Sequence, residues 1–164
     1  HAITSFAKAL YNGQDSVLTN VMRIGEALYD AMTFDGKATT VATDAADAFR
    51  LRRGVCQDFT HIIILALQAV DIPAAYVTGY LRTLPPKGGV KLEGADAMHA
   101  WVDVWCGAAL GWVGFDPTNN CLAREDHIAI GMGRDYADVS PIDGTFLGSA
   151  PQSMSSAVDV ERID

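Results

Sequence analysis

The length, composition and charge of this chain place it among ordinary globular domains. Its 164 residues are typical of one domain, and 49% hydrophobic with 20% charged residues is enough to build a core. The net charge of -8, spread along the chain as in a solvated surface, argues against nucleic acid and anionic membranes as partners. The longest apolar run, residues 62–67, is too short for a membrane span, and we predict no signal peptide.

The cysteine pattern argues against a disulfide or zinc framework. The three cysteines, Cys56, Cys106 and Cys121, cannot all pair, and none belongs to a Cys-x-x-Cys motif. We therefore expect no metal and no cofactor. Free thiols favour a reducing compartment, so the cytoplasm is the expected location.

Two amphipathic helices are predicted in the first third of the chain. Apolar side chains recur at three- or four-residue spacing up to about Met32, after a cap at Asp15 and Ser16. A second, shorter helix is predicted over residues 44–51, with Thr43 as its cap. Neither helix is long enough to form a domain by itself, so both are expected to pack on later elements.

The most regular helical pattern contains the first residue of chemical interest. It runs from just before Cys56 to Asp71, where Pro73 disfavours helix at the residue before it. Cys56 then lies in the first turn, where the helix dipole and unpaired N–H groups favour a reactive thiolate. A lone cysteine beside an apolar helix is more often core filler, so this position needs partners to indicate catalysis.

The second half of the chain changes to the alternating pattern of strands. Strands are predicted at residues 74–81, 99–105 and 112–116, with weaker ones at 90–92, 128–130 and 157–160. Loops are predicted at residues 85–89, 107–111 and 144–156. Helices followed by strands favour an α+β fold in which N-terminal helices pack on an antiparallel sheet.

Two of these strands would bring a histidine and a carboxylate together. If Trp105 faces Trp112 in an antiparallel hairpin, Asp116 lies opposite Trp101 and diagonal to His99. Such neighbours are about 7–8 Å apart between backbones, which is within side-chain reach. The carboxylate would hold the imidazole, and the imidazole would activate the thiol, as in enzymes with a nucleophile, a base and an orienting acid.

Four segments together resemble a known family. They are RGVCQDF (53–59), GYL (79–81), HAWVDV (99–104) and GWVGFDPTN (111–119). In this order, within about residues 32–139, they resemble the bacterial transglutaminase-like cysteine peptidases. The resemblance implies a papain-like α+β fold with a catalytic Cys56 at a core-helix N-terminus and a triad of Cys56, His99 and Asp116.

Two departures qualify the resemblance. Calcium-dependent animal transglutaminases carry tryptophan where this chain has Gln57, and no acidic loop suitable for calcium is apparent. Family members with a Gln-Asp pair after the cysteine usually carry an extra N-terminal β domain. We therefore expect residues 1–164 to be a single catalytic core. Whether this sequence is a fragment that lacks an N-terminal β domain is left open.

Several further residues receive weaker assignments. The backbone N–H of Gln57 could join that of Cys56 in an oxyanion hole, and Tyr80 and Trp101 could line the acyl site. Ordinary helix or core packing is the alternative for each. Asp58 is expected to serve the helix end and to point away from the thiol. The remaining cysteines are expected to be structural, the Asn119–Asn120 pair to belong to a turn, and His61 and His127 receive no role.

The predicted activity is acyl transfer through a thioester on Cys56. His99 would deprotonate the thiol and later protonate the leaving amine. Hydrolysis is favoured over amine transfer, because water is always present and no acidic amine-binding groove is apparent. The expected partner is a protein, peptide or small amide substrate, and the sequence makes no prediction of oligomeric state.

Two alternatives belong to other classes of protein. The first is a non-catalytic interaction module, because some transglutaminase-like domains have lost the triad and act as scaffolds. The second is a small metalloprotein, which the absence of zinc-like ligand spacing disfavours. Selective reactivity of Cys56 would distinguish the enzyme from the scaffold.

Overall fold

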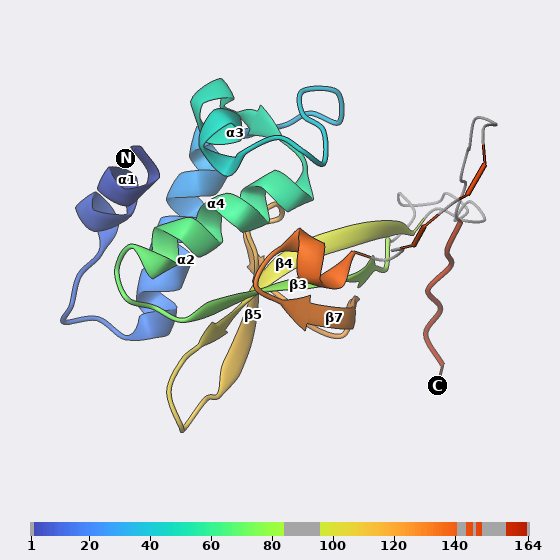
Figure 1. Ribbon diagram of the computed structural model, residues 1–164. Coiled ribbons are helices and arrows are strands. Elements are labelled where there is room, and N and C mark those ends of the chain that lie inside the picture. The colour runs from blue at the N-terminus through green and yellow to red at the C-terminus, as the bar shows by residue number, and fades with distance from the viewer. Residues whose placement is uncertain (1, 84–95, 141–143, 146, 149–156, 164) are drawn as a thin grey trace, which may run out of the picture.

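The computed structural model describes residues 2–83, 96–140, 144–145, 147–148 and 157–163, and it has an α+β architecture (Figure 1). As predicted, the helices come first and the strands of the main sheet follow. The elements are α1 (Ala2–Leu10), α2 (Val17–Ala31), β1 (Thr33–Phe34), α3 (Ala45–Leu51), β2 (Arg53–Gly54), α4 (Cys56–Gln68), β3 (Ala74–Leu81), β4 (Ala97–Trp105), β5 (Trp112–Asp116), β6 (Cys121–Leu122), β7 (His127–Gly133) and the 3-10 helix η1 (Tyr136–Val139).

The helix predictions hold with small shifts at the ends. Helix α2 begins after Ser16, whose side chain accepts the Thr19 N–H, so the predicted cap is confirmed. The cap of α3 is Asp44 rather than the predicted Thr43. Helix α4 ends at Gln68 rather than Asp71, because Asp71 adopts the left-handed backbone conformation (φ 60°) in the turn before Pro73. Helix α1 was not predicted.

The main sheet has the order β6-β5-β4-β3-β7, and its neighbouring strands are antiparallel. Strands β3 and β5 have the predicted bounds, whereas β4 begins two residues before His99 and β7 extends beyond the predicted 128–130. The predicted strand at 157–160 is wrong, since Val158 makes only an isolated bridge to Asp96. The predicted 85–89 loop, the 90–92 strand and most of the 144–156 loop lie outside the described residues.

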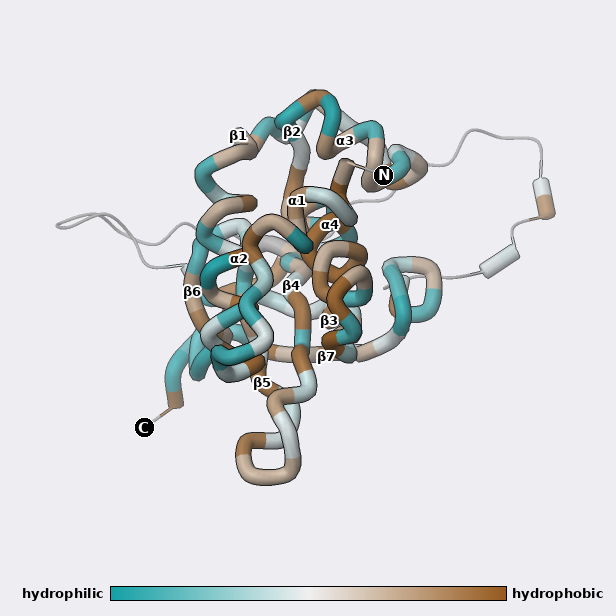
Figure 2. The backbone as a smooth tube through the Cα atoms, turned by 90° about the vertical axis from the view of Figure 1, so that its left-hand side faces the viewer, coloured by the Kyte–Doolittle hydropathy of each residue, from teal (hydrophilic) through white to brown (hydrophobic). Residues whose placement is uncertain are grey.

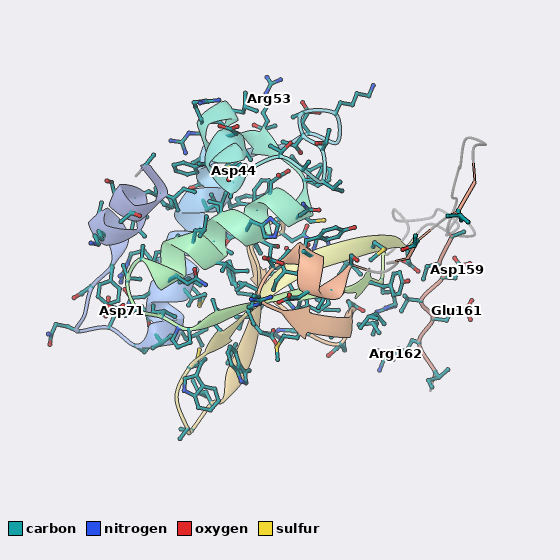
Figure 3. The ribbon with its side chains drawn as sticks, viewed as in Figure 1. Asp44, Arg53, Asp71, Asp159, Glu161 and Arg162 are labelled. Atoms are coloured by element: carbon teal, nitrogen blue, oxygen red, sulfur yellow. The ribbon has the colours of Figure 1, made fainter. Side chains whose placement is uncertain are left out.

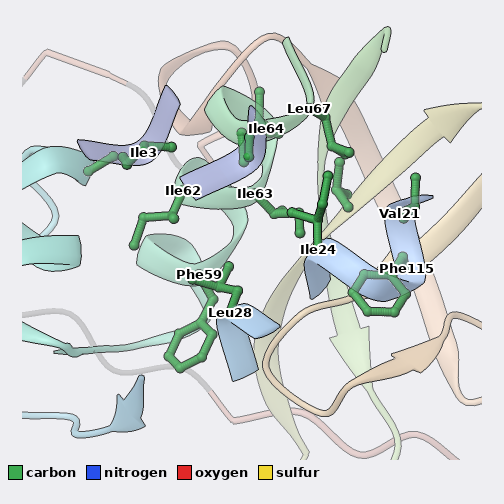
Figure 4. Close-up of a cluster of buried hydrophobic side chains, with 14 of the residues drawn as sticks. Ile3, Val21, Ile24, Leu28, Phe59, Ile62, Ile63, Ile64, Leu67 and Phe115 are labelled. Carbon is green, nitrogen blue, oxygen red and sulfur yellow. The ribbon is translucent and has the colours of Figure 1, made fainter. Parts of the chain in front are cut away.

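The hydrophobic core lies between the helices and one face of this sheet. Helix α4 crosses the sheet and α1, α2 and α3 surround it (Figure 1), while α4, β3 and β4 form a hydrophobic centre (Figure 2). Figure 4 shows part of this cluster, in which side chains of α1, α2 and α4 gather and Phe115 of β5 lies beside Val21 and Ile24 of α2. The sheet contributes Ala100, Val102 and Val104, which the alternation of β4 had placed on one face. The packed core fixes α4 against the strand that carries His99.

Several charged side chains lie at the periphery of the molecule, whereas Asp58, Asp96 and Asp116 are buried. Asp44, Arg53 and Asp71 lie in the helical half, whereas Asp159, Glu161 and Arg162 lie in the C-terminal segment away from α4 (Figure 3). Among the described residues, no helix is both long and apolar enough to cross a membrane.

Candidate active site

Cys56 is the first residue of α4, as the sequence predicted. Its thiol is free and partly exposed. The start of the helix is held by Asp58, whose carboxylate accepts the Val55 N–H at 2.8 Å and the Thr39 hydroxyl at 2.6 Å. Gly54 permits this arrangement, because a Cβ there would lie 2.5 Å from the Asp58 carboxylate oxygen. The carboxylate nearest in sequence to Cys56 is therefore occupied by the helix end.

Gln57 connects the start of α4 to the preceding loop. Its side-chain amide donates to the Val41 carbonyl oxygen at 3.1 Å, and only 8% of the residue is exposed. The side chain is thus used for packing the loop. Because N–H groups in the first turn of a helix have no partner within the helix, the backbone donors of Cys56 and Gln57 fit the predicted oxyanion role.

His99 and Asp116 meet across the β4–β5 pair. The His99 Nε2 and Asp116 Oδ2 atoms are 2.7 Å apart, and Trp105 lies opposite Trp112 in the register assumed from the sequence. This bond occupies Nε2 and leaves Nδ1 as the other ring nitrogen, and Cys56 lies close enough to His99 to raise its pKa. The structure therefore brings His99 and Asp116 of the predicted triad into direct contact, and the assignment of Cys56 as their partner stays a prediction.

The electrostatics of His99 favour a charged imidazole. Burial alone would lower its pKa, but the hydrogen bonds and charges of Asp116 and Cys56 outweigh burial and raise the pKa to about 9. A protonated His99 at neutral pH would stabilise a thiolate beside it. The site thus presents a cationic imidazole close to Cys56.

Asp116 is completely buried and receives five donors. Its Oδ1 atom accepts the N–H groups of Thr118 (2.9 Å) and Asn119 (3.2 Å), and its Oδ2 atom accepts the Asn119 side-chain amide at 2.7 Å. The other two donors to Oδ2 are His99 and His127. Burial would raise the pKa of Asp116, but these bonds and the His99 charge hold it well below its usual range. Asn119, predicted as a turn residue, also anchors the carboxylate.

His127 is the residue of this site that sequence reasoning missed. Its Nε2 atom lies 3.1 Å from Asp116 Oδ2, and its Nδ1 atom accepts the Arg124 N–H at 3.3 Å. Strand β7 brings it there by pairing with β3, where His127 lies opposite Leu81. A polar residue at the start of a weak strand pattern gives no signal of its own, because only this long-range pairing places it beside Asp116.

Trp101 and Tyr80 occupy different surroundings. Trp101 is 3% exposed, packs against His99, and packs edge-on against His127 at 5.2 Å between centroids. It therefore shields the histidines from water. Tyr80 lines a cavity of about 340 Å³ between the sheet and η1. Their predicted role in lining the acyl site stays a prediction.

The cluster of His99, Asp116 and His127 also resembles a set of metal ligands. Their nearest ligand atoms all lie within 4.8 Å of one another. However, His127 Nδ1 already accepts an N–H, so the neutral ring carries its proton on Nε2 and donates to Asp116. The same carboxylate oxygen accepts His99 at 2.7 Å, as a hydrogen bond requires. The donor pattern therefore fits a proton network rather than a metal site.

The other cysteines and His61 make none of the hydrogen bonds described above for His99 and Asp116, although Cys121 lies opposite Asp116 in the β5–β6 register. Burial raises the pKa of the Cys106 and Cys121 thiols, and the Asp116 charge adds to the effect at Cys121. His61 Nε2 accepts the Tyr136 N–H at 3.2 Å, which fixes η1 on α4. Burial lowers the pKa of His61. His61 therefore links α4 to η1.

Comparison with solved structures identifies the class of fold. A candidate cysteine protease from Cytophaga hutchinsonii superposes with a TM-score of 0.70 and 29% identity, over 85% of this chain and 44% of that one. Legionella pneumophila LapG in its calcium-bound form shares the fold at 15% identity with a TM-score of 0.55, over 90% of this chain and 82% of that one. The periplasmic domain of Pseudomonas aeruginosa TgpA gives a TM-score of 0.50 at 24% identity, over 73% and 41% of the two chains.

Residues 4–117 match the model of the transglutaminase-like superfamily, and the chain belongs to that superfamily. The expected fold and family are thereby confirmed. The uncharacterised protein Rv2569c of Mycobacterium tuberculosis is 40% identical over 147 residues, which cover 87% of this chain and 46% of that protein. Bacillus subtilis YebA is 25% identical over 127 residues, or 71% of this chain and 17% of YebA. The chain thus spans less than half the length of these relatives.

Proposed function

We propose that this chain is a cysteine-nucleophile enzyme that cleaves amide or related acyl bonds through a thioester on Cys56. The observation that carries the proposal is the 2.7 Å contact between His99 and the buried carboxylate of Asp116, with Cys56 close enough to raise the pKa of His99. Membership of the transglutaminase-like superfamily supports the same chemistry. The Cys56 sulfur, a His99 ring nitrogen and an Asp116 carboxylate oxygen then serve as the nucleophile, the base and the orienting acid.

The reaction would begin with a thiolate on Cys56 and a proton on both ring nitrogens of His99. The Cys56 thiolate attacks the carbonyl carbon, and backbone N–H groups in the first turn of α4 stabilise the developing oxyanion. His99 gives its proton to the leaving amine as the C–N bond breaks, which leaves an acyl-thioester and a neutral imidazole. His99 then takes a proton from water as the hydroxide adds to the thioester carbonyl, and the C–S bond breaks to release the acid and the Cys56 thiolate, with His99 protonated as at the start.

Hydrolysis is the favoured outcome over amine transfer. Water needs no dedicated binding site, whereas an amine acceptor would be favoured by an acidic groove beside the thiol. The carboxylates close to the site, Asp58 and Asp116, are engaged in hydrogen bonds at the helix start and at His99. The proposed substrate is a protein, a peptide or a small amide.

The test is chemical reactivity combined with turnover. Wild-type protein should be alkylated by iodoacetamide first at Cys56, and alkylated protein should lose hydrolysis of p-nitrophenyl acetate. The matched variant Cys56→Ala should lose the same activity while keeping its circular dichroism spectrum. Equal and slow alkylation of Cys56, Cys106 and Cys121 would favour the scaffold alternative.

Cellular location belongs to the proposal as well. The three cysteines are free, which favours the reducing cytoplasm. The solved structure of TgpA, a fold neighbour, is that of a periplasmic domain, and this location is a property of TgpA. Fractionation of cells that express the full-length natural protein would decide between the two compartments.

A further inference from the structure

We propose that His127 is a positioning residue that holds the Asp116 carboxylate in place for His99. The inference rests on the proposed triad and adds a fourth member to it. Two hydrogen bonds define the role, because His127 Nδ1 accepts the Arg124 N–H and Nε2 faces Asp116 Oδ2 at 3.1 Å. The ring thus links a backbone turn to the carboxylate that orients the base.

The tautomer of His127 follows from its neighbours. Since Nδ1 accepts a backbone N–H at 3.3 Å, the neutral ring must carry its proton on Nε2. That proton points to a carboxylate oxygen, so His127 acts as a donor to Asp116. A histidine in this state has no free nitrogen for substrate, and its side chain is only 7% exposed. It therefore acts through Asp116 rather than on the reacting atoms.

The fold fixes the orientation of this ring. His127 begins β7 and lies opposite Leu81 on β3, while β3 also pairs with the strand that carries His99. Trp101 packs edge-on against the ring, with centroids 5.2 Å apart. A Trp101 side chain that is almost fully buried keeps water away from this hydrogen bond. The imidazole is consequently held by the backbone on one side and by the indole on another.

The chemistry explains why a fixed donor is useful. During the proposed reaction His99 alternates between imidazolium and imidazole, so its attraction for Asp116 weakens once in each cycle. His127 and Asn119 donate to the same Oδ2 atom and do not change charge in these steps. They would keep the buried Asp116 carboxylate hydrogen-bonded and in the same orientation while His99 is neutral. His99 can then return to one orientation for the second proton transfer.

Two substitutions separate this role from a merely structural one. In His127→Gln, the side-chain amide reproduces the Nε2 donor to Asp116. In His127→Asn, the shorter amide reproduces the Nδ1 acceptor for Arg124 but cannot reach Asp116. The positioning role predicts that Gln retains activity and Asn loses it, whereas a purely structural role predicts the reverse.

The assay measures kcat and KM for p-nitrophenyl acetate, with circular dichroism as the folding control. We expect His127→Asn to lower kcat/KM by about 10- to 100-fold, mainly through kcat, by analogy with the loss seen when an outer hydrogen-bond partner of a metal ligand is removed. His127→Gln should stay within about threefold of wild type. Asn within threefold of wild type, or equal losses in both variants, would overturn the inference.

Two further measurements keep the test decisive. Cys56→Ala is assayed in parallel: if it remains active, the proposed function itself fails, and if only the His127 result fails, the triad stands without this residue. If His127→Asn does not fold, ¹⁵N NMR of the wild-type imidazoles decides. A protonated Nε2 and an unprotonated Nδ1 on His127 support the inference, and the opposite tautomer overturns it.

Discussion

His99 Nε2 and Asp116 Oδ2 lie 2.7 Å apart even though the two residues are not opposite each other in the sheet. The β4–β5 register ends at Val102 and Phe115, and its continuation places Asp116 opposite Trp101, one diagonal step from His99. The bond therefore runs obliquely between neighbouring strands. It contributes to the raised pKa of His99, about 9, and so to a charged imidazole beside Cys56 at neutral pH.

The first prediction concerns the relative reactivity of the three thiols. At pH 7 iodoacetamide should modify Cys56 at least about tenfold faster than Cys106 or Cys121, because a protonated His99 favours thiolate there. Burial raises the pKa of the other two thiols and so keeps them in the unreactive form. Timed alkylation followed by peptide mass spectrometry measures the three rates. His99→Ala should remove the advantage of Cys56, and an unchanged rate in that variant would contradict the charged pair.

The second prediction is that the triad substitutions fail unequally. Cys56→Ala should abolish turnover, since no other group forms the thioester, and His99→Ala should be nearly as severe because the proton carrier is lost. Asp116→Asn should be milder, because a thiolate favoured by the helix end depends less on an oriented base than a serine would. Steady-state turnover of p-nitrophenyl acetate gives the comparison. An Asp116→Asn variant that is less active than His99→Ala would reject this order.

The choice of asparagine at position 116 matters for folding. Asp116→Ala removes no large apolar group, which by itself would favour an intact fold. The structure argues otherwise, since alanine would leave the N–H groups of Thr118 and Asn119 buried without their acceptor. Each such loss costs about 1–3 kcal/mol. Urea unfolding should therefore show Asp116→Ala to be clearly less stable than Asp116→Asn.

The third prediction follows from linkage at His99. Its folded pKa of about 9 lies above the ordinary value of 6.5, so its stabilising contribution is complete below 6.5 and disappears as the pH rises through 9. The difference in free energy of unfolding between wild type and His99→Gln should shrink between pH 6 and pH 10, by on the order of 2 kcal/mol. Urea titrations at four pH values would measure it. A difference that is constant or grows with pH would contradict a raised pKa.

Much of this site follows from local sequence patterns. The glycine-bearing loop and the flanking tryptophans define the β4–β5 hairpin, so the meeting of His99 and Asp116 could be predicted by counting residues. The first-turn position of Cys56 follows from the helical period of α4 and from Gly54 just before it. In both cases the relevant partners lie within one hairpin or one helix, where spacing in sequence fixes spacing in structure.

The parts that escaped prediction depend on long-range packing. His127 reaches Asp116 only because β7 pairs with β3 rather than with its neighbour β6, and its irregular register at Thr78 and Gly79 weakens the alternating pattern. Helix α1 is short and becomes stable by burying Ile3 and Ala7 against the core. Local propensity carries neither kind of information.

The fourth prediction concerns metal removal. Activity should survive dialysis against EDTA, because the proposed chemistry uses only protein groups and because His99 and His127 donate protons to Asp116. Turnover before and after dialysis, with calcium and zinc added back separately, is the measurement. Loss of activity that one of these ions restores would show that the His99, Asp116 and His127 cluster binds metal instead.

The fifth prediction tests how the sheet supports the site. A Cβ at Gly79 would lie 2.1 Å from the Ile128 carbonyl oxygen and 2.7 Å from the Trp101 ring, so Gly79→Ala must separate β3 from β7 or displace the indole. Overpacking of this kind costs about 1–3 kcal/mol, and backbone on one side of the contact favours the upper end.

Gly131→Ala in β7 is the matched control for this substitution, since its Cβ would make only ordinary contacts at 3.4–3.5 Å with Val139 and Thr78. The temperature of thermal unfolding and the rate of ester turnover should both fall in Gly79→Ala, because the displaced strand carries His127. Both should remain close to wild type in Gly131→Ala. Activity that survived in a destabilised Gly79→Ala protein would separate the stability of the β3–β7 pair from catalysis. The position of His127 would then not depend on the close approach of these two strands.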